Sequence, residues 1–134
     1  MSEPTLNRLK AAFERKEFED IYNDGRSIFA EITVGGCTAH VIYDHYLHER
    51  HIWLDSLVTQ FETRGFGEAT NALNIIFTIA DKFDLPVKIE AVPVDQRIAL
   101  EYLLAWYQKR GFVITEMRGS SALMERRARV LTLA

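Results

Sequence analysis

Hydrophobic and polar residues change their spacing several times along the chain, and each change marks a new element. Between residues 5 and 22 the apolar side chains recur every three or four positions, which predicts a helix with one buried face. Ser27 to Val34 then alternates position by position, as a half-buried strand does. Gly35 and Gly36 predict a two-residue hairpin turn, and Thr38 to Tyr43 supplies its returning strand.

A third strand is expected from His51 to Thr59. Strict alternation divides its side chains between two faces, because successive side chains of a strand point to opposite sides. The first face would carry Ile52, Leu54, Ser56 and Val58, and the second would carry Trp53, Asp55, Leu57 and Thr59.

The second half of the chain returns to helical spacing. Gly67 to Asp84 predicts a strongly amphipathic helix, and Val87 to Val92 predicts a strand after it. Asp95 can cap a further helix that runs to Arg110, because aspartate is favoured at the start of a helix. Gly111 follows at a position where glycine commonly ends a helix.

The chain closes with two short strands, over residues 112–116 and 122–129, that form a hairpin. The complete order is helix, three strands, helix, strand, helix and two strands. This order predicts an α+β fold, in which helices flank both faces of one mixed, mostly antiparallel sheet. At 134 residues, with 48% hydrophobic and 26% charged residues, the whole chain 1–134 is expected to form a single globular domain.

Charge and cysteine content narrow the function. The net charge of −3 argues against a general nucleic-acid binder, which would carry a basic excess. The longest apolar run, Leu73 to Ala80, is interrupted by polar residues and is too short to span a membrane. The N-terminus lacks the basic and then apolar layout of a signal peptide, so we expect a cytoplasmic protein. The single cysteine, Cys37, excludes an internal disulfide and a cysteine-rich zinc site.

The stretch Arg64-Gly65-Phe66-Gly67-Glu68-Ala69 carries the strongest chemical signal. It lies between an expected strand and a long helix, and its glycines let the backbone approach a ligand closely. The amides of a helix's first turn, together with the helix dipole, form a site suited to a diphosphate. No Gly-Lys-Ser/Thr sequence follows, and only two of the three glycines of a dinucleotide fingerprint are present. A tight turn that binds nothing is the alternative.

These six residues resemble the Gln/Arg-x-x-Gly-x-Gly/Ala signature of the GNAT acyltransferase superfamily. Trp106-Tyr107-Gln108-Lys109-Arg110-Gly111-Phe112 resembles that family's Tyr-x-x-x-Gly-Phe segment, and the likeness covers about residues 51–116. The resemblance implies an enzyme that transfers an acyl group from acetyl-CoA to an amine and releases CoA. One departure is the distance of twelve residues from Asp95 to Tyr107, which weakens any role transferred to Asp95 or Gln96.

The resemblance also implies positions for the cofactor. A bulge in the strand before the signature would splay two strands apart, and pantetheine would bond to the backbone of Leu57, Val58 and Thr59. The amides from Arg64 to Ala69 would hold the pyrophosphate. Tyr107 would lie near the thioester sulfur and protonate the leaving thiolate. The alternatives are that Tyr107 is a core aromatic residue, or that Tyr102 takes its role.

The implied reaction is a direct attack of a neutral amine on the thioester carbonyl, with the backbone amide near Val58 as the oxyanion donor. Asp55 and Glu90, on the strands that would flank the gap, are candidates for the base that deprotonates the amine, and Glu31 is a third. Each of them can equally be a solvated strand carboxylate. Cys37 would need a neighbouring histidine to form an acyl-enzyme, and nothing in the sequence places one there. No set of His, Asp and Glu has the spacing of a metal site.

The sequence does not identify the acceptor, which can be an amine of a small molecule or of a protein. The short region before residue 51 predicts an open acceptor site, which fits a protein acceptor or a site that a second subunit completes in a homodimer. The alternative function is a catalytically silent GNAT-fold module that binds another protein, through the aromatic and histidine residues between Tyr43 and His51. An unrelated α+β protein with a coincidental turn is the third alternative.

Overall fold

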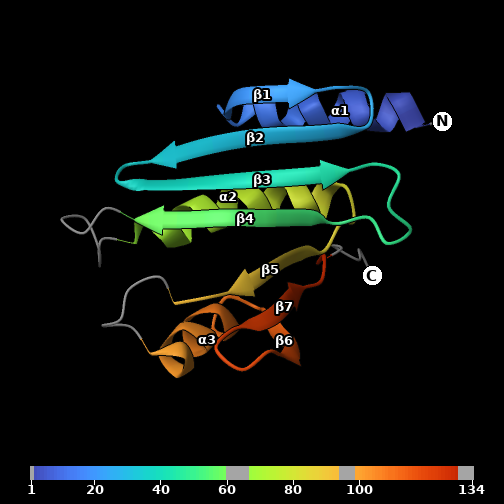
Figure 1. The fold of residues 1–134 in the computed structure, drawn as a ribbon. Helices are drawn as coiled ribbons and strands as arrows, with labels where there is room; N and C mark the ends of the chain where they lie inside the picture. Colours follow the sequence, from blue (N-terminus) through green and yellow to red (C-terminus); the bar gives the residue numbers. More distant parts are fainter. Residues whose placement is uncertain (1, 60–66, 94–98, 130–134) are drawn as a thin grey trace, which may run out of the picture.

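The computed structural model describes residues 2–59, 67–93 and 99–129. Within them the chain forms three helices and seven strands (Figure 1). In chain order these are α1 (Ser2–Arg15), β1 (Glu19–Asn23), β2 (Ser27–Val34), β3 (Cys37–Asp44), β4 (Ile52–Thr59), α2 (Glu68–Lys82), β5 (Val87–Ala91), α3 (Leu100–Gln108), β6 (Val113–Met117) and β7 (Ala122–Arg126). None of the helices in these ranges is long and apolar enough to cross a membrane.

The strands form one sheet in the order β1-β2-β3-β4-β5-β7-β6. Every neighbouring pair is antiparallel except β4 and β5, which run parallel. The expected α+β class and the mixed, mostly antiparallel sheet are therefore confirmed. The parallel pair follows from the connection through α2, because parallel neighbours need a crossover and a helix commonly supplies it.

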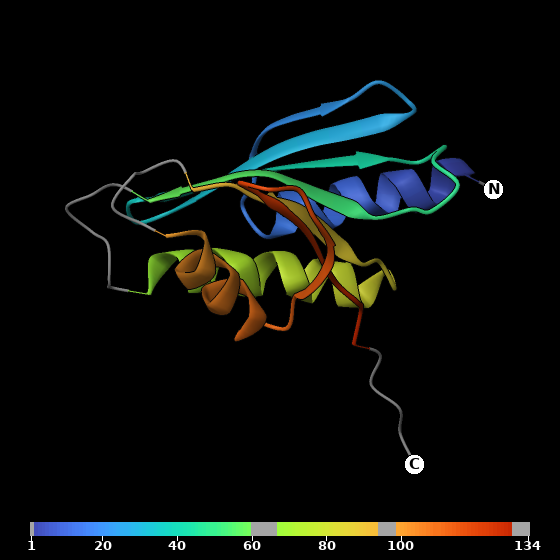
Figure 2. The ribbon, with the colours of Figure 1, turned by 60° about the horizontal axis from the view of Figure 1, so that its bottom comes forward.

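One face of the sheet carries the hydrophobic core. Residues that pair across neighbouring strands, such as Ala30 with Val41 and Ile89 with Met124, are almost fully buried on this core face. All three helices add side chains to the same core: Leu9 and Phe13 from α1, Leu73 and Ile76 from α2, and Leu104 and Tyr107 from α3. Figure 2 shows the helices on this side of the sheet.

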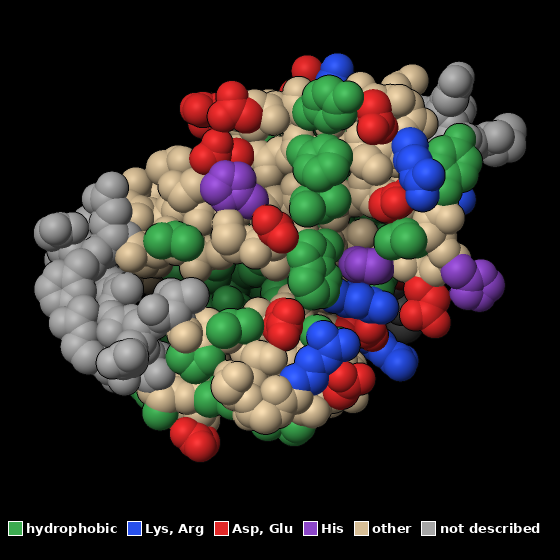
Figure 3. Space-filling view, in the orientation of Figure 1, with side chains coloured by type: hydrophobic (Ala, Val, Ile, Leu, Met, Phe, Trp, Pro, Cys, Tyr) green, Lys and Arg blue, Asp and Glu red, His purple; other side chains and the backbone are tan. Residues whose placement is uncertain are grey.

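The other face, which we call the open face, corrects the expectation that helices flank both sides. No described helix lies on it, and Phe29 on β2 is 42% exposed there. The physical reason is the short turn over residues 24–26 between β1 and β2, which leaves no chain to form a covering helix at that edge. Figure 3 looks onto the open face and shows hydrophobic side chains in a column across the strands.

The helix expected over residues 5–22 is wrong in its second half. α1 ends before Lys16, and the amide of Phe18 bonds back to the carbonyl of Phe13 at 3.1 Å, which closes the helix. The following residues form β1, which pairs with β2. The helical spacing extended too far because the apolar residues of β1 happen to continue it.

The remaining elements lie close to their expected positions. Val34 pairs with Cys37, which confirms the two-residue hairpin at Gly35 and Gly36. α3 ends before Gly111, whose φ of 100° is a conformation that glycine adopts without strain. The start of α3 differs from expectation, since Ala99 is the residue before its first turn. Asp95, the expected cap, and Gln96 lie outside the described residues.

Candidate active site

β4 and β5 lie side by side only where they begin. Ile52 pairs with Val87 and Trp53 with Lys88, and no later residue of β4 pairs with β5 in the part of the chain that the structure describes. Figure 1 shows the two strands diverging toward their C-terminal ends. The stretch 57–59, expected to bind pantetheine, therefore lies on an edge of β4 whose backbone groups β5 does not occupy.

A bulge in β4 accompanies this divergence. Ser56 pairs with His40, whereas Leu54 pairs with Val41, so Asp55 is an extra residue on β4. Such a bulge bends its strand and increases the local twist. The bulge that the resemblance implies for this strand is thus found at Asp55.

The bulge also corrects the expected faces of β4. Ile52 and Leu54 are buried on the core face before the bulge, but the alternation reverses beyond it. Leu57 lies opposite the buried Ala39, and Val58 is 56% exposed on the open face. The expectation that Val58 shares a face with Ile52 is wrong because one inserted residue turns every later side chain to the other side.

α2 begins at an uncapped N-terminus. Gly67 precedes it with a φ of 79°, in the left-handed region that glycine tolerates. Gly67 has no side chain that could cap the helix, and no side-chain cap is found there among the described residues. The first turn of a helix has backbone amides without intrahelical partners, which suit an anion. Gly67, Glu68 and Ala69 of the expected loop are described, whereas Arg64, Gly65 and Phe66 lie outside the described residues.

The Glu68 side chain anchors the start of α2 to the β2–β3 hairpin. Its Oε1 accepts a hydrogen bond from the Gly36 amide at 3.0 Å. Gly35 has a φ of 57°, and a Cβ at this position would overlap the Glu68 carboxylate. The hairpin glycines therefore make room for the carboxylate that holds α2 in place. This role was missed because it depends on a contact between residues far apart in the sequence.

Tyr107 lies on the core side of α3 and is 8% exposed. Its ring meets the Trp106 and Phe112 rings edge-on, at centroid distances of 5.1 and 5.4 Å. Burial, and to a lesser extent the neighbouring Cys37, raises the pKa of Tyr107 to about 12. Its hydroxyl therefore stays protonated at neutral pH and can donate a hydrogen bond. Tyr102, by contrast, is 67% exposed.

Cys37 is fully buried at the start of β3, where it pairs with Thr59 of β4. Burial raises the pKa of the Cys37 thiol, although a hydrogen bond with Thr59 opposes this effect. A raised pKa keeps the thiol protonated, and the thiol is a poor nucleophile compared with the thiolate. The environment of Cys37 therefore favours a packed strand residue over an acyl-enzyme nucleophile.

The three candidate bases occupy separate places. Asp55 is exposed at the bulge. Glu90, on β5, accepts a hydrogen bond from the Ser121 hydroxyl at 2.8 Å. Glu31, on β2, lies 3.3 Å from Nε2 of His40. In the described residues no hydrogen bond or ion pair joins these carboxylates to one another.

His40 and Ser56 are polar residues for which no function was predicted. Nδ1 of His40 lies 2.7 Å from Oγ of Ser56. With Glu31 they form a row across β2, β3 and β4, next to the bulge. The two-residue hairpin sets the pairing of Glu31 with His40, whereas the bulge that sets the pairing of His40 with Ser56 has no signal in the sequence.

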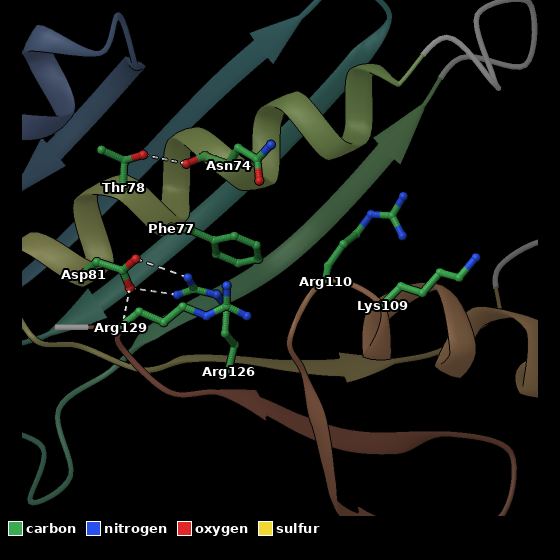
Figure 4. Close-up of a pocket in the computed structure, with 8 residues that line it drawn as sticks. All are labelled: Asn74, Phe77, Thr78, Asp81, Lys109, Arg110, Arg126 and Arg129. Atoms are coloured by element: carbon green, nitrogen blue, oxygen red, sulfur yellow. Dashed lines mark hydrogen bonds and ion pairs between the residues drawn. The ribbon is translucent and has the colours of Figure 1, made fainter. Parts of the chain in front are cut away.

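A cavity of about 410 Å³ lies between α2 and the ends of α3 and β7 (Figure 4). It is lined by Asn74, Phe77, Thr78, Asp81, Lys109, Arg110, Arg126 and Arg129. Four cationic side chains against one carboxylate make this lining electropositive. Arg110 extends it toward the start of α2, since its Nε donates to the Thr70 hydroxyl at 3.0 Å and its guanidinium lies 3.7 Å from the Trp106 ring centre.

A metal site is not found in residues 2–59, 67–93 and 99–129, where no three His, Cys, Asp or Glu side chains lie close enough to hold an ion.

No protein-family model matches the sequence, and no curated protein sequence matches it significantly. Solved structures do match. The anti-CRISPR protein AcrVA5 has a TM-score of 0.56 at 22% identity, over 75% of this chain and 97% of its own. Arabidopsis thaliana Naa50, in complex with the bisubstrate analogue CoA-Ac-MVNAL, has 0.53 at 18% identity, over 92% and 91%. An aminoglycoside 6'-N-acetyltransferase complexed with coenzyme A has 0.54 at 12%, over 91% and 89%.

The described residues have an α+β fold of the kind found in these solved structures. This is the fold that the resemblance to the GNAT superfamily implies. At these identities the likeness shows the fold alone and carries no information about a substrate.

Proposed function

We propose that the chain is an acyl-CoA-dependent N-acyltransferase, which transfers an acetyl group from acetyl-CoA to an amine by direct attack. The observation that carries the proposal is the gap between β4 and β5 beside the uncapped start of α2. An extended chain can bond to the free edge of β4, and a diphosphate can bond to the first turn of α2. Two structural neighbours, Naa50 and the aminoglycoside acetyltransferase, are complexes with CoA compounds, which supports the same cofactor here.

Each part of the proposed site has its own role in binding the cofactor or stabilising the reaction. Backbone groups of Leu57, Val58 and Thr59 hold pantetheine, and the amides that begin α2 hold the pyrophosphate. The amide near Val58 donates to the oxyanion, which costs no reorganisation because the strand already fixes it. Arg110, at the electropositive cavity, adds positive charge beside α2.

Tyr107 assists at the sulfur mainly by donating a hydrogen bond. Its pKa of about 12 lies well above the ordinary value of a thiol, near 8.5. Complete transfer of its proton to a thiolate of ordinary pKa would therefore be uphill. A hydrogen bond still stabilises the negative charge that develops there, without a net loss of the proton.

A matched pair of substitutions, Gly67→Glu and Gly67→Gln, tests the cofactor site. Both place a side chain at a φ of 79°, with nothing within 4 Å of the added Cβ, so both share a strain of about 1–2 kcal/mol. Only the glutamate adds a negative charge near the bound diphosphate. Two charges 4 Å apart repel by about 1 kcal/mol in water and by about 4 kcal/mol near a protein surface.

Gly67→Glu should therefore bind acetyl-CoA at least about tenfold more weakly than Gly67→Gln, as measured by isothermal titration calorimetry. A glutamate at a helix N-terminus stabilises the helix by about 0.3–1 kcal/mol. The weaker binder should consequently be at least as stable as its partner, which separates lost binding from lost folding. Equal affinities of the two variants would contradict the assignment of this loop.

The second candidate function is a silent module that binds a protein. Tyr43 and His45, expected to be exposed on its binding surface, are each 1% exposed, so that expectation is wrong for these two residues. The open face offers another surface for such a module. Tyr22 and Phe29 are 57% and 42% exposed there, and their ring centres lie 6.0 Å apart. The same surface suits a protein or other large amine acceptor if the chain is an enzyme. Acetyl-CoA binding by the wild-type chain separates the two functions, because the silent module does not need the cofactor.

A further inference from the structure

A row of polar side chains crosses three strands of the open face beside the bulge. Glu31 on β2 pairs in register with His40 on β3, and His40 pairs with Ser56 on β4. Oε1 of Glu31 lies 3.3 Å from Nε2 of His40, and Nδ1 of His40 lies 2.7 Å from Oγ of Ser56. Ser56 directly follows the bulge residue Asp55, on the strand that borders the gap.

We propose that this row is a proton relay for the acceptor amine. Ser56 contacts the amine, His40 receives the proton through Ser56, and Glu31 is the positioning residue that orients His40. The inference rests on the proposed acyltransferase function and assigns its general base.

The arrangement of the row decides which imidazole nitrogen of His40 accepts the hydrogen bond from Ser56. A carboxylate beside Nε2 favours a proton on that nitrogen, so Nδ1 is left to accept from the Ser56 hydroxyl. Histidine ordinarily titrates near neutral pH, whereas a carboxylate with an ordinary pKa near 4 is a much weaker base. His40 is therefore better suited to the task than the carboxylates of the open face.

An acceptor that begins as an ammonium ion loses two protons when it becomes an amide, and the proposed steps account for both. Oγ of Ser56 accepts one proton from the ammonium while its own hydroxyl proton passes to Nδ1 of His40. The neutral amine then forms a C–N bond to the thioester carbon, and the C–S bond breaks. The second nitrogen proton leaves with the sulfur as the thiol. The His40 side chain is 49% exposed, so it can return its proton to solvent.

Three carboxylates lie on the strands around His40. Glu31 faces it from β2, Asp55 neighbours Ser56 on β4, and Glu19 on β1 lies next to Glu31 in the sheet. In the described residues no lysine or arginine forms an ion pair with Glu31.

Two probe amines test the relay, with thiol release from acetyl-CoA as the readout. Benzylamine is protonated at neutral pH and needs a base, whereas methoxyamine is already neutral. His40→Gln should lower kcat/KM for benzylamine by about a hundredfold or more, and for methoxyamine by less than about threefold. The acetyl-CoA Kd should be unchanged, and His48→Gln, at an exposed histidine, is the matched control.

The pH dependence of kcat/KM distinguishes a catalytic role of His40 from a purely structural one. With benzylamine, kcat/KM of the wild-type chain should fall as the pH drops through the histidine range, and His40→Gln should lose this inflection. Glu31→Gln, which removes the partner that orients His40, should reduce transfer to benzylamine more than transfer to methoxyamine. Ser56→Ala should reduce transfer to benzylamine more than transfer to methoxyamine.

Equal losses with both amines, or wild-type rates in His40→Gln, would overturn the relay while leaving the acyltransferase function intact. A wild-type chain that binds acetyl-CoA but acetylates neither amine would overturn the relay as the base for these amines and leave the acetyl-CoA site intact. A chain that does not bind acetyl-CoA would overturn the cofactor site itself.

Discussion

Asp81 on α2 holds the end of β7 against the helix. Its carboxylate accepts hydrogen bonds from Nη1 and Nη2 of Arg126 at 2.8 and 3.1 Å, and from the Arg129 amide at 2.9 Å (Figure 4). The Arg126 side chain is only 5% exposed and its guanidinium lies 4.0 Å from the Phe77 ring centre. A charge buried this deeply depends on its partner, because burial without one carries a large desolvation penalty.

Asp81→Ala should destabilise the fold by about 3 kcal/mol. Removing one partner of a buried ion pair typically costs about 3–5 kcal/mol, and the lower end applies because the Asp81 side chain is 27% exposed. Adding Arg126→Met should restore at least about 1.5 kcal/mol, since it removes the stranded charge and keeps an apolar side chain over Phe77. The comparison of the single and double variants isolates the charge from the packing.

Urea denaturation at pH 7 measures these differences. Glu116→Ala is the control, since Glu116 pairs with Arg118 at the surface and should cost less than about 1 kcal/mol. Burial alone would raise the pKa of Asp81, but the hydrogen bonds from Arg126 and Arg129 lower it overall. Because this pKa is lower in the folded chain than in the unfolded chain, ionised Asp81 stabilises the fold at pH values above the ordinary carboxyl pKa. This stabilisation is lost as the pH falls through the pKa of the folded chain. The difference in free energy of unfolding between the wild type and Asp81→Ala should therefore become smaller below about pH 4.

A cost of Asp81→Ala below about 1 kcal/mol would refute this reasoning. So would a double variant that is no more stable than Asp81→Ala alone.

Three further predictions follow from other parts of the site. Tyr107→Phe should keep the acetyl-CoA Kd but slow acetyl transfer by about tenfold to a hundredfold in a thiol-release assay, because the ring stays packed and only the donor is lost; an unchanged rate would place the donor elsewhere. Gly35→Ala should weaken acetyl-CoA binding in calorimetry, since a Cβ there displaces the Glu68 carboxylate from the start of α2; wild-type affinity would show that this anchor is dispensable. His45 is 1% exposed, and burial, followed by the charge of Arg50, lowers its pKa. The free energy of unfolding in urea should therefore fall as the pH drops below about 6.5, where the histidine of the unfolded chain takes up a proton. In His45→Gln this fall with pH should be smaller.

The fold could be predicted from the sequence wherever local spacing decides the structure. The β2–β3 hairpin followed from alternation around Gly35 and Gly36, and α2 from its apolar stripe. The first helix was predicted to be too long, because the helical spacing of apolar residues continues through Phe18 into β1. This spacing alone does not reveal where the helix ends. The single covered face could not be foreseen either, since it depends on how elements pack.

The proposed cofactor side of the site depends on motifs, which a single sequence displays directly. Gly67 and Tyr107 stand where those motifs place them, beside an uncapped helix start and in the core of α3. The acceptor side depends on register. The bulge at Asp55 reverses the side-chain order beyond it, and this reversal puts Ser56 beside His40 and Val58 on the open face. An inserted residue leaves no mark in the alternation of an eight-residue strand, so these neighbours were missed.

Calorimetric titration of the wild-type chain with acetyl-CoA tests the central claim most directly. A gap between β4 and β5 beside an uncapped α2 predicts saturable binding with a micromolar Kd, and Gly67→Glu should weaken it far more than Gly67→Gln. Absence of binding at millimolar acetyl-CoA, in a chain shown to be folded, would contradict the claim that this gap is a cofactor site.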